Sequence, residues 1–436
     1  MQREDIEALL PELQAFHQRF GQYFCRTEGR LLSEKYLMGL TLPIERKNVE
    51  NLAEQVGVST RVLQRFVTES PWDDQGCISE LQKLVGEGCG SKDGVLILDD
   101  TGFAKKGQRS AGVGRQYSGT LGRTDNCQIG VFLSYASRKG HTLVDRRLYL
   151  MKQWFGAEAS ERRRWAGVPD NVQFHTKLEL GMEMVKAADA AGHLPYEWVT
   201  GDAAYGDCHD LRTAVEELQK LYCFEVSSTS AVWLTPPEWQ VPAGQGPRGR
   251  RRTRAKPTTA SSRSQTVASV AADPHVVTWI RHRVQEGAKG PREYEFARVR
   301  VIEKRHRRPG SEGWLMLRRP VGGGEVKYYL SNAPEDTPLE TMAHVGCLRW
   351  TIEENFELAK GEVGLDHYEV TQYRGWYNHI TMSMMALAFL KQVQWKWGKK
   401  STRQRSRDTG VAPRRSPRDR VDCGHSYCVA SPSTAA

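Results

Sequence analysis

Four consecutive apolar residues, Val95 to Leu98, lead directly into the aspartates Asp99 and Asp100. A short, unbroken apolar run that ends in polar residues is typical of a strand buried on both faces of its sheet. A Gly-rich, basic loop follows, from Gly102 to Asp125. The run therefore predicts a buried strand that ends in carboxylates.

The middle of the chain repeats this pattern. We expect further strands at 128–135, 143–150, 197–200 and 222–226, and helices at 174–191 and 210–221. The first strand and 128–135 fit an antiparallel pair joined by the long loop. The strand at 197–200 ends at Gly201 and Asp202, which places another carboxylate at a strand end. Strands that alternate with helices in this way indicate an α/β core.

Composition and cysteine use point to a cytoplasmic protein without a membrane partner. The first residues lack the apolar segment of a signal peptide, and the most apolar stretch, 382–390, is too short to cross a bilayer. Nine cysteines occur without a Cys-x-x-Cys pair, which favours reduced thiols over a disulfide framework. Cys423, His425 and Cys428 lack a fourth zinc ligand nearby, so we expect no zinc site there.

The positive charge is concentrated in two segments. The formal net charge is +10, yet residues 248–256 alone contribute +6, and residues 396–420 carry ten Lys or Arg against two Asp. The remainder is therefore slightly acidic. Basic segments of this kind strengthen non-specific DNA binding by releasing counterions, although solvated linkers have the same composition.

Residues 51–66 fit a helix-turn-helix. Gly57 would form the turn and Ser59 would cap the second helix. The buried stripe of that helix would consist of Val62, Leu63 and Phe66. The outward positions, where a recognition helix carries its DNA contacts, would be Thr60, Arg61, Gln64 and Arg65. A helical hairpin that only packs against the core explains the same pattern.

The second half of the chain divides by composition. Residues 236–275 are rich in Pro, Gly, Ser and Arg, so we expect disorder there. Strands are predicted at 294–301, 313–318 and 326–331, helices run from 338 to about 396, and the last forty residues have no hydrophobic period. The predicted regions are helical 1–90, core 91–235, linker and β-rich insertion 236–337, core helices 338–396 and basic disordered tail 397–436.

A third acidic site lies in the helix after residue 338. At about 100° per residue, Glu353 lies about 40° from Arg349 around the helix, and Lys360 lies about 20° from Arg349. A carboxylate flanked by cations on one face is suited to hold a metal ion beside a DNA phosphate. Ordinary Arg–Glu pairing four residues apart on a surface helix is the alternative.

Together these motifs resemble a family. The spacing Arg349-x3-Glu353-x6-Lys360 resembles the Tyr-x2-Arg-x3-Glu-x6-Lys element of a large group of bacterial insertion-sequence DDE transposases, which are DDE superfamily endonucleases. The segments 99–107, 115–119, 201–206 and 364–370 also resemble that group, and the resemblance covers roughly residues 15–395. Where the group has its tyrosine, this chain has Gly346, so that DNA contact is missing or supplied elsewhere.

The resemblance implies an RNase H-like core with a β-rich insertion. It also implies that the catalytic carboxylates are Asp100, in preference to Asp99, together with Asp202 and Glu353. They would bind two Mg²⁺ ions, for which Mn²⁺ can substitute, and Arg349 and Lys360 would hold phosphates. The reaction would be cleavage at the element ends followed by strand transfer into target DNA, with a homodimer on DNA in the nucleoid.

Two other functions fit parts of the sequence. A repressor derived from a transposase would keep the DNA-binding segments without catalysis, and a nuclease on the same core would cut without joining. The loop after the first carboxylate holds basic residues that either grip phosphates or keep the loop soluble, namely Lys105, Lys106, Arg109, Arg115 and Arg123. We expect the aromatic side chains of Trp350, Trp376 and Tyr377 to pack in the core and not to stack on bases. For His367 and His379 we expect hydrogen-bonded structural roles.

Overall fold

The structure is a computed structural model that describes residues 9–119, 122–241, 256–257, 263–287 and 290–408. The chain divides into a large unit, Met1–Gln392, and a small C-terminal unit, Val393–Ala436. Cys423, His425 and Cys428 lie outside the described residues. The seven cysteines within them are all free thiols, as predicted. None of the described helices is long and apolar enough to span a membrane.

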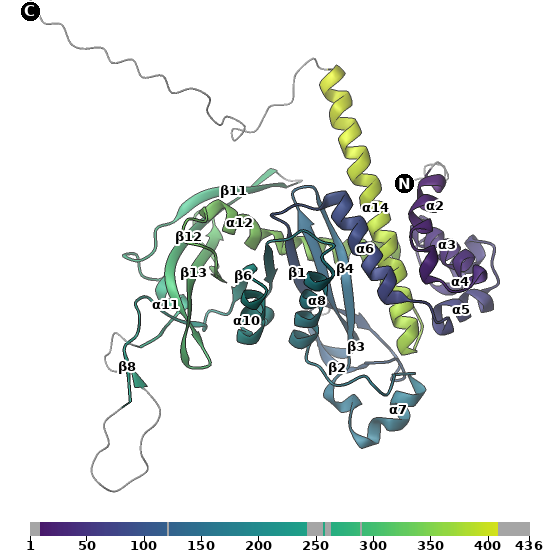
Figure 1. Cartoon of the computed structure of the whole chain (residues 1–436), viewed down its shortest axis with the longest axis horizontal. Helices are drawn as coiled ribbons and strands as arrows, with labels where there is room; N and C mark the ends of the chain where they lie inside the picture. Colours follow the sequence, from purple (N-terminus) through teal and green to yellow (C-terminus); the bar gives the residue numbers. More distant parts are fainter. Residues whose placement is uncertain (1–8, 120–121, 242–255, 258–262, 288–289, 409–436) are drawn as a thin grey trace, which may run out of the picture. The chain divides into compact units, whose positions relative to one another are not determined.

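One mixed sheet runs through the large unit (Figure 1). Its strands follow the order β10-β7-β12-β13-β14-β6-β5-β1-β3-β2, with β4 added on β3 and β11 added on β12. The core strands are β1 (Val95–Ala104), β2 (Gly114–Ser118), β3 (Arg123–Ser137), β4 (Gly140–Tyr149), β5 (Trp198–Gly201) and β6 (Leu221–Val226). The others are β7 (Ala231–Trp233), β10 (Gln265–Thr266), β11 (Ile280–Gly287), β12 (Gly290–Arg305), β13 (Arg308–Pro320) and β14 (Lys327–Ser331). The predicted α/β class is confirmed.

The core half of the sheet combines both strand directions. β1 pairs antiparallel with β3, as predicted, and parallel with β5, which in turn is parallel to β6. Between these strands run α7 (Ser160–Trp165), α8 (Lys177–Ala191), α9 (Ala203–Gly206) and α10 (His209–Glu217). This mixed sheet with helices agrees with the RNase H-like core that the resemblance implied.

β1 is longer than its apolar run. We expected the strand to end at Leu98, but it continues to Ala104, so Asp99 and Asp100 lie inside it, opposite Phe132 and Val131 of β3. The reason is that β3 pairs with β1 as far as Cys127, and this ladder satisfies the backbone groups beyond the apolar run. The first carboxylates therefore have fixed, opposite directions on a strand.

The insertion continues the core sheet. β14 pairs antiparallel with β6, so the predicted β-rich segment extends the catalytic half without a break. The expectation of disorder over 236–275 is wrong for part of that range. Gln265–Thr266 pairs with β7, and α11 (Val267–Ala271) buries Val267 and Val270, since apolar side chains spaced three apart share one helical face. Trp239–Gln240 (β8) and Lys256–Pro257 (β9) form a separate pair.

The N-terminal region is helical, as predicted. It contains α2 (Leu10–Gln18), the short 3₁₀ turn at Gly21–Tyr23, α3 (Thr27–Thr41), α4 (Val49–Gln55), α5 (Thr60–Glu69) and α6 (Asp74–Cys89). Gly57 has φ of 64° between α4 and α5, which confirms the predicted turn. Ser59 precedes α5 but makes no side-chain capping bond, and Val62 is 38% exposed, so those two expectations are wrong. The buried stripe is Leu63, Phe66 and Val67, and Val62 lies at its edge, about 40° from Phe66 and about 100° from Leu63 around the helix.

The C-terminal helices join this helical region to the core. They are α12 (Leu339–Leu348), α13 (Trp350–Val363) and α14 (Tyr373–Asp408). In α14, His379 is buried and bonds Tyr36 at 2.8 Å, and Asn378 donates to the carbonyl of Val67 at 2.9 Å, so this histidine has the structural role we expected. The helix continues past residue 396 to Asp408, which corrects the prediction of no structure for 397–408. The tail from 409 onward lies outside the described residues.

Candidate active site

The two adjacent aspartates of β1 have different partners. Successive side chains of a strand point to opposite faces. Asp100 meets Lys177 of α8, whose Nζ lies 3.1 Å from both carboxylate oxygens. Asp99 lies on the other face, with its Oδ2 3.7 Å from the Arg349 guanidinium.

Thr101 shows which face belongs to the third motif. It shares the parity of Asp99, and its hydroxyl accepts a hydrogen bond from Lys360 Nζ at 2.8 Å. Both Arg349 and Lys360 therefore approach the Asp99 face of the sheet. The basic residues of the third motif meet Asp99, whereas Asp100 meets a basic residue that the sequence did not single out, Lys177.

Asp202 lies beside these carboxylates because β5 is parallel to β1. Leu98 pairs with Gly201, so Asp99 and Asp202 are the next residues on adjacent strands. The Asp202 carboxylate caps α9 by accepting from the backbone N–H groups of Ala204 at 3.0 Å and Tyr205 at 3.3 Å. The sheet register thus brings the second predicted carboxylate to the first.

Burial and mutual repulsion disturb the ionisation of these groups. Burial, followed by the negative charge of Asp202, raises the pKa of Asp99 to about 7. Burial also raises the pKa of Asp100, where Lys177 opposes the shift and Asp202 adds to it. The negative charge of Asp202 thus raises the pKa of both strand aspartates, and a bound cation would relieve that repulsion.

Arg349 lies among three carboxylates. It is the single residue between α12 and α13, and its guanidinium lies 2.6 Å from Glu353, 3.7 Å from Asp99 and 3.8 Å from Glu225 of β6. Burial opposes the charged form, but these carboxylates raise the pKa of Arg349 above its usual value. The predicted Arg–Glu pair of the third motif is present, and it also reaches the sheet.

Glu225 is a residue that the sequence analysis missed. It is 12% exposed and also binds Lys327 of β14 at 3.0 Å, so it joins the insertion to Arg349. The available signal was a charged residue within the otherwise apolar strand at 221–226. A charge in such a strand indicates a fixed partner.

The donor set fits a hard divalent cation, but the side chains are not gathered around one point. Among the described residues, no group of three or more His, Cys, Asp or Glu side chains is arranged to hold a metal ion. Glu353 turns to Arg349, and Asp100 turns to Lys177. Carboxylate oxygens are the ligands that Mg²⁺ and Ca²⁺ prefer, so the chemistry is suitable and the geometry requires these pairs to open.

The other predicted residues differ in their exposure to solvent. Arg61, Gln64 and Arg65 are exposed on α5, as predicted, and Arg65 pairs with Glu69 at 3.4 Å. Trp376 is fully buried, whereas Trp350 is 36% exposed, so its assignment to the core is wrong. Trp350 is the first residue of α13, next to the joint at Arg349, where the helix surface is only partly covered.

The loop after β1 is also divided. Lys105 donates to the carbonyl of Tyr368 at 3.1 Å and lies 3.5 Å from the centre of its ring, which favours a structural role. The remaining basic residues that the sequence singled out in this loop and at the start of β3 are exposed, namely Lys106, Arg109, Arg115 and Arg123. Their two alternative roles both remain consistent with that exposure.

Comparison with known proteins gives the family. Residues 16–291 match the family described as DDE superfamily endonuclease, which is more than half of the chain. The chain belongs to the DDE superfamily endonucleases. A relative, the "Probable transposase for insertion sequence element IS701" of Microchaete diplosiphon, is 28% identical over 205 residues, which are 46% of this chain and 50% of that protein. The chain thus spans about half the length of this curated relative.

Endonucleases of this family generally use divalent metal ions. The family match includes Asp99, Asp100 and Asp202 but ends before Glu353. In this DDE superfamily endonuclease, the assignment of the third motif therefore depends on its own geometry. That geometry is the approach of Arg349 and Lys360 to the face of β1 that carries Asp99.

Gly346 departs from the resemblance for a steric reason. A Cβ atom at this position would lie 3.0 Å from Cε of Met316 and 3.4 Å from the ring of Tyr329, both in the insertion. A tyrosine would have to displace these side chains. Position 346 of this endonuclease therefore packs on the insertion and does not present a side chain to a ligand.

Proposed function

We propose that this chain is an insertion-sequence transposase, which cleaves DNA at the ends of its element and joins those ends to target DNA. The observation that carries the proposal is the meeting of three segments far apart in sequence. Asp99 and Asp202 directly follow the last pair of the parallel β1–β5 ladder, Leu98 and Gly201, and Arg349 of the third motif reaches Asp99 while it holds Glu353. Family membership and the transposase relative support the same reaction.

We assign the catalytic carboxylates to Asp202, Glu353 and one member of the Asp99–Asp100 pair. The resemblance favours Asp100, whereas the contact with Arg349, which also holds Glu353, favours Asp99; the charge of Asp202 raises the pKa of both aspartates. These carboxylates would hold Mg²⁺, with Mn²⁺ as a substitute. A pair of such ions, when bound, stabilises the attacking and the leaving oxygens of in-line phosphoryl transfer.

The cations of the site have a separate role. Arg349 and Lys360 lie on the carboxylate face, where their guanidinium and ammonium groups can turn from Glu353 and Thr101 to DNA phosphates. An arginine suits this role because its planar fork binds two phosphate oxygens at once. They would position the DNA strand without taking part in bond breaking.

The helical region at 1–90 would read the DNA sequence, and 91–235 with 338–396 would form the catalytic core. Support for a reading helix comes from the exposure of Arg61, Gln64 and Arg65 after a sharp turn at Gly57. The segment at 248–256 and the tail after 396 would add non-specific affinity. The active assembly would be a homodimer on DNA in the cytoplasm.

The proposal is tested with end-labelled DNA that carries the flanking repeats of the element. Wild-type protein should cleave it in Mg²⁺ or Mn²⁺ and not in chelator. Asp202→Ala and Glu353→Ala should bind the same DNA but leave it intact. Binding without cleavage by the wild-type protein would favour a repressor, and cleavage without joining would favour a nuclease.

A further inference from the structure

A polar cavity lies outside the acidic site. It has a volume of about 420 Å³ and is bounded by the start of α10, the turn between β6 and β7 and the tip of the β12–β13 hairpin. Hydroxyl groups of Ser227 and Thr229 lie on one wall, and Lys304 and Arg307 lie on another. These side chains are mainly hydrogen-bond donors, and the cationic ones come from the insertion.

The carboxylate in this wall is already engaged. Asp207 accepts from the Ser230 hydroxyl at 2.6 Å and from the Ser227 backbone N–H at 3.2 Å. Lys304 donates to the Ser264 hydroxyl at 2.9 Å, and an ammonium group has three donors. The Ser227 and Thr229 hydroxyls bond each other at 3.0 Å, and the cationic side chains of Lys304 and Arg307 face a single carboxylate in the lining, so the ligand that fits is an anion.

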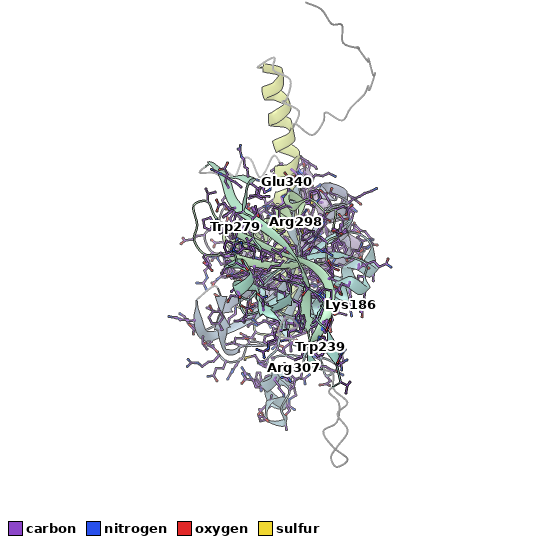
Figure 2. The ribbon with its side chains drawn as sticks, turned by 90° about the vertical axis from the view of Figure 1, so that its left-hand side faces the viewer. Lys186, Trp239, Trp279, Arg298, Arg307 and Glu340 are labelled. Atoms are coloured by element: carbon purple, nitrogen blue, oxygen red, sulfur yellow. The ribbon has the colours of Figure 1, made fainter. Side chains whose placement is uncertain are left out.

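The hairpin tip adopts a demanding backbone conformation. His306 and Arg307 have φ of 45° and 66°, the left-handed region that two-residue hairpin turns usually fill with Asn or Gly. Residues other than glycine persist there when the surrounding structure holds them, often at binding sites. Both side chains line the cavity. Figure 2 labels Arg307 near the lower end of the insertion.

A buried ionic network fixes this tip. Arg305, the residue before the turn, binds Glu216 of α10 at 2.7 Å and Glu303 at 2.8 Å. Glu303 in turn binds Arg212 of α10 at 3.1 Å and accepts from the Tyr222 hydroxyl at 2.6 Å. Because a buried ion pair adds little net stability compared with apolar packing, the network is better explained by the position that it imposes on the hairpin.

We propose that this cavity binds a phosphate group of the DNA backbone, as a second DNA contact separate from the acidic site. Hydroxyl, ammonium and guanidinium donors at a fixed spacing are the groups that hold backbone phosphates. The inference rests on the proposed function, since it takes DNA as the ligand.

The cavity is close enough to the acidic site for one DNA strand to reach both. Asp202 and Asp207 flank the single turn of α9, and five residues of helix rise by about 7.5 Å. A DNA strand advances about 3.4 Å per nucleotide along the helix axis, so a strand at the acidic site passes the cavity within a few nucleotides. The bound phosphate would belong to a nucleotide near the cleavage position.

The test compares two charge-matched double variants. Lys304→Ala/Arg307→Ala removes the cations of the cavity, and Arg281→Ala/Arg308→Ala removes two cations of the same insertion that do not line it. DNA affinity is measured by fluorescence anisotropy from 50 to 200 mM salt. Loss of one phosphate contact should lower the salt slope by about 0.9, which changes the affinity ratio across this range about three- to fourfold. The control pair should retain the wild-type slope.

A second arm uses inorganic phosphate as the probe. The imidazole NMR signals of His209 and His306 should shift on phosphate addition in the wild-type and control proteins, and not in the cavity variant. If the cavity variant and the control variant show the same salt slope and the same phosphate-dependent NMR shifts, the proposed site is wrong. Phosphate-dependent shifts with an unchanged DNA slope overturn DNA as the source and leave a free anion. Failure of the wild-type protein to cleave DNA counts against the proposed function alone, because neither arm requires cleavage.

Discussion

The ion pair between Arg212 and Glu303 joins the core to the insertion and is closed to solvent. Both side chains are 2% exposed, and Glu303 accepts from Arg212, Arg305 and the Tyr222 hydroxyl. Although burial opposes ionisation, the two arginines and these hydrogen bonds lower the pKa of Glu303 below its usual range. Glu303→Gln keeps the shape but leaves two guanidinium groups facing a neutral amide.

The expected loss follows from this burial. Removing one partner of a buried ion pair costs about 3–5 kcal/mol, and we expect the lower end because the glutamine carbonyl still accepts from Tyr222. The control is Glu293→Gln, which breaks the ion pair between Glu293 and Arg281. The Arg281 side chain is 61% exposed and the Glu293 side chain is 32% exposed. An exposed pair contributes about 0–1 kcal/mol.

Urea unfolding combined with hydrogen exchange measures this difference. Exchange is needed because a chain of this size need not unfold in a single step. Amide protection in α10 and β12 should fall strongly in Glu303→Gln and little in the control. Arg212→Met combined with Glu303→Leu should recover part of the loss, since fewer charges remain buried. Equal losses in Glu303→Gln and Glu293→Gln would refute the closed junction.

Five further substitutions test the site, the proposed reading helix and the packing of α14. One of the two variants Asp99→Asn and Asp100→Asn should abolish cleavage and the other should reduce it far less; loss in Asp99→Asn supports the contact with Arg349 as the guide, loss in Asp100→Asn supports the family resemblance, and full activity in both would contradict the site. Arg61→Ala or Gln64→Ala should lower the discrimination between terminal-repeat and random DNA by about 1–3 kcal/mol if a base contact is lost, and an unchanged ratio would leave α5 as a packing helix. Burial lowers the pKa of His379 from 6.5 to about 3, so its contribution to stability is complete above pH 6.5 and is lost as the pH falls. The loss should reach about 2–3 kcal/mol at pH 4.5, and His379→Gln should flatten this part of the stability profile measured by urea unfolding.

β1 shows which features of a strand can be predicted from its own sequence. The run at 95–98 correctly predicted a buried strand, because unbroken apolar residues require cover on both faces. It did not predict that Asp99 and Asp100 lie within the strand, since this depends on pairing with β3, more than twenty residues away. The register with β3 places the two aspartates on opposite faces, and the side-chain contacts show that Arg349 meets Asp99 whereas Lys177 meets Asp100.

The insertion shows the same division between local and long-range information. Alternating and apolar segments correctly predicted strands between residues 294 and 331. The pairing of β14 with β6, which joins these strands to the core sheet, could not be predicted, because the two strands are far apart in the sequence and neither carries a local signal of its partner. The contacts of Glu225 with Arg349 and Lys327 depend on that pairing, which explains why this residue was missed.

The helix-turn-helix was predicted in outline from Gly57 and the spacing of Leu63 and Phe66. Val62 lies about 100° from Leu63 but about 40° from Phe66 around the helix, so helical phase places it at the edge of the stripe, and the neighbouring elements decide its exposure. The apolar character of Val62 was therefore not enough to predict whether its side chain is buried.

The proposed transposase activity can be measured directly in a strand-transfer assay with labelled element ends and unlabelled plasmid. Wild-type protein in Mg²⁺ should give plasmid-sized labelled products, and Asp202→Ala or added chelator should give none, while anisotropy shows that the variant still binds the ends. Asp202 is the informative position because it directly follows Gly201, which pairs with the residue before Asp99. Labelled products that persist in Asp202→Ala, or that form equally in chelator, would contradict metal-dependent strand transfer at Asp202.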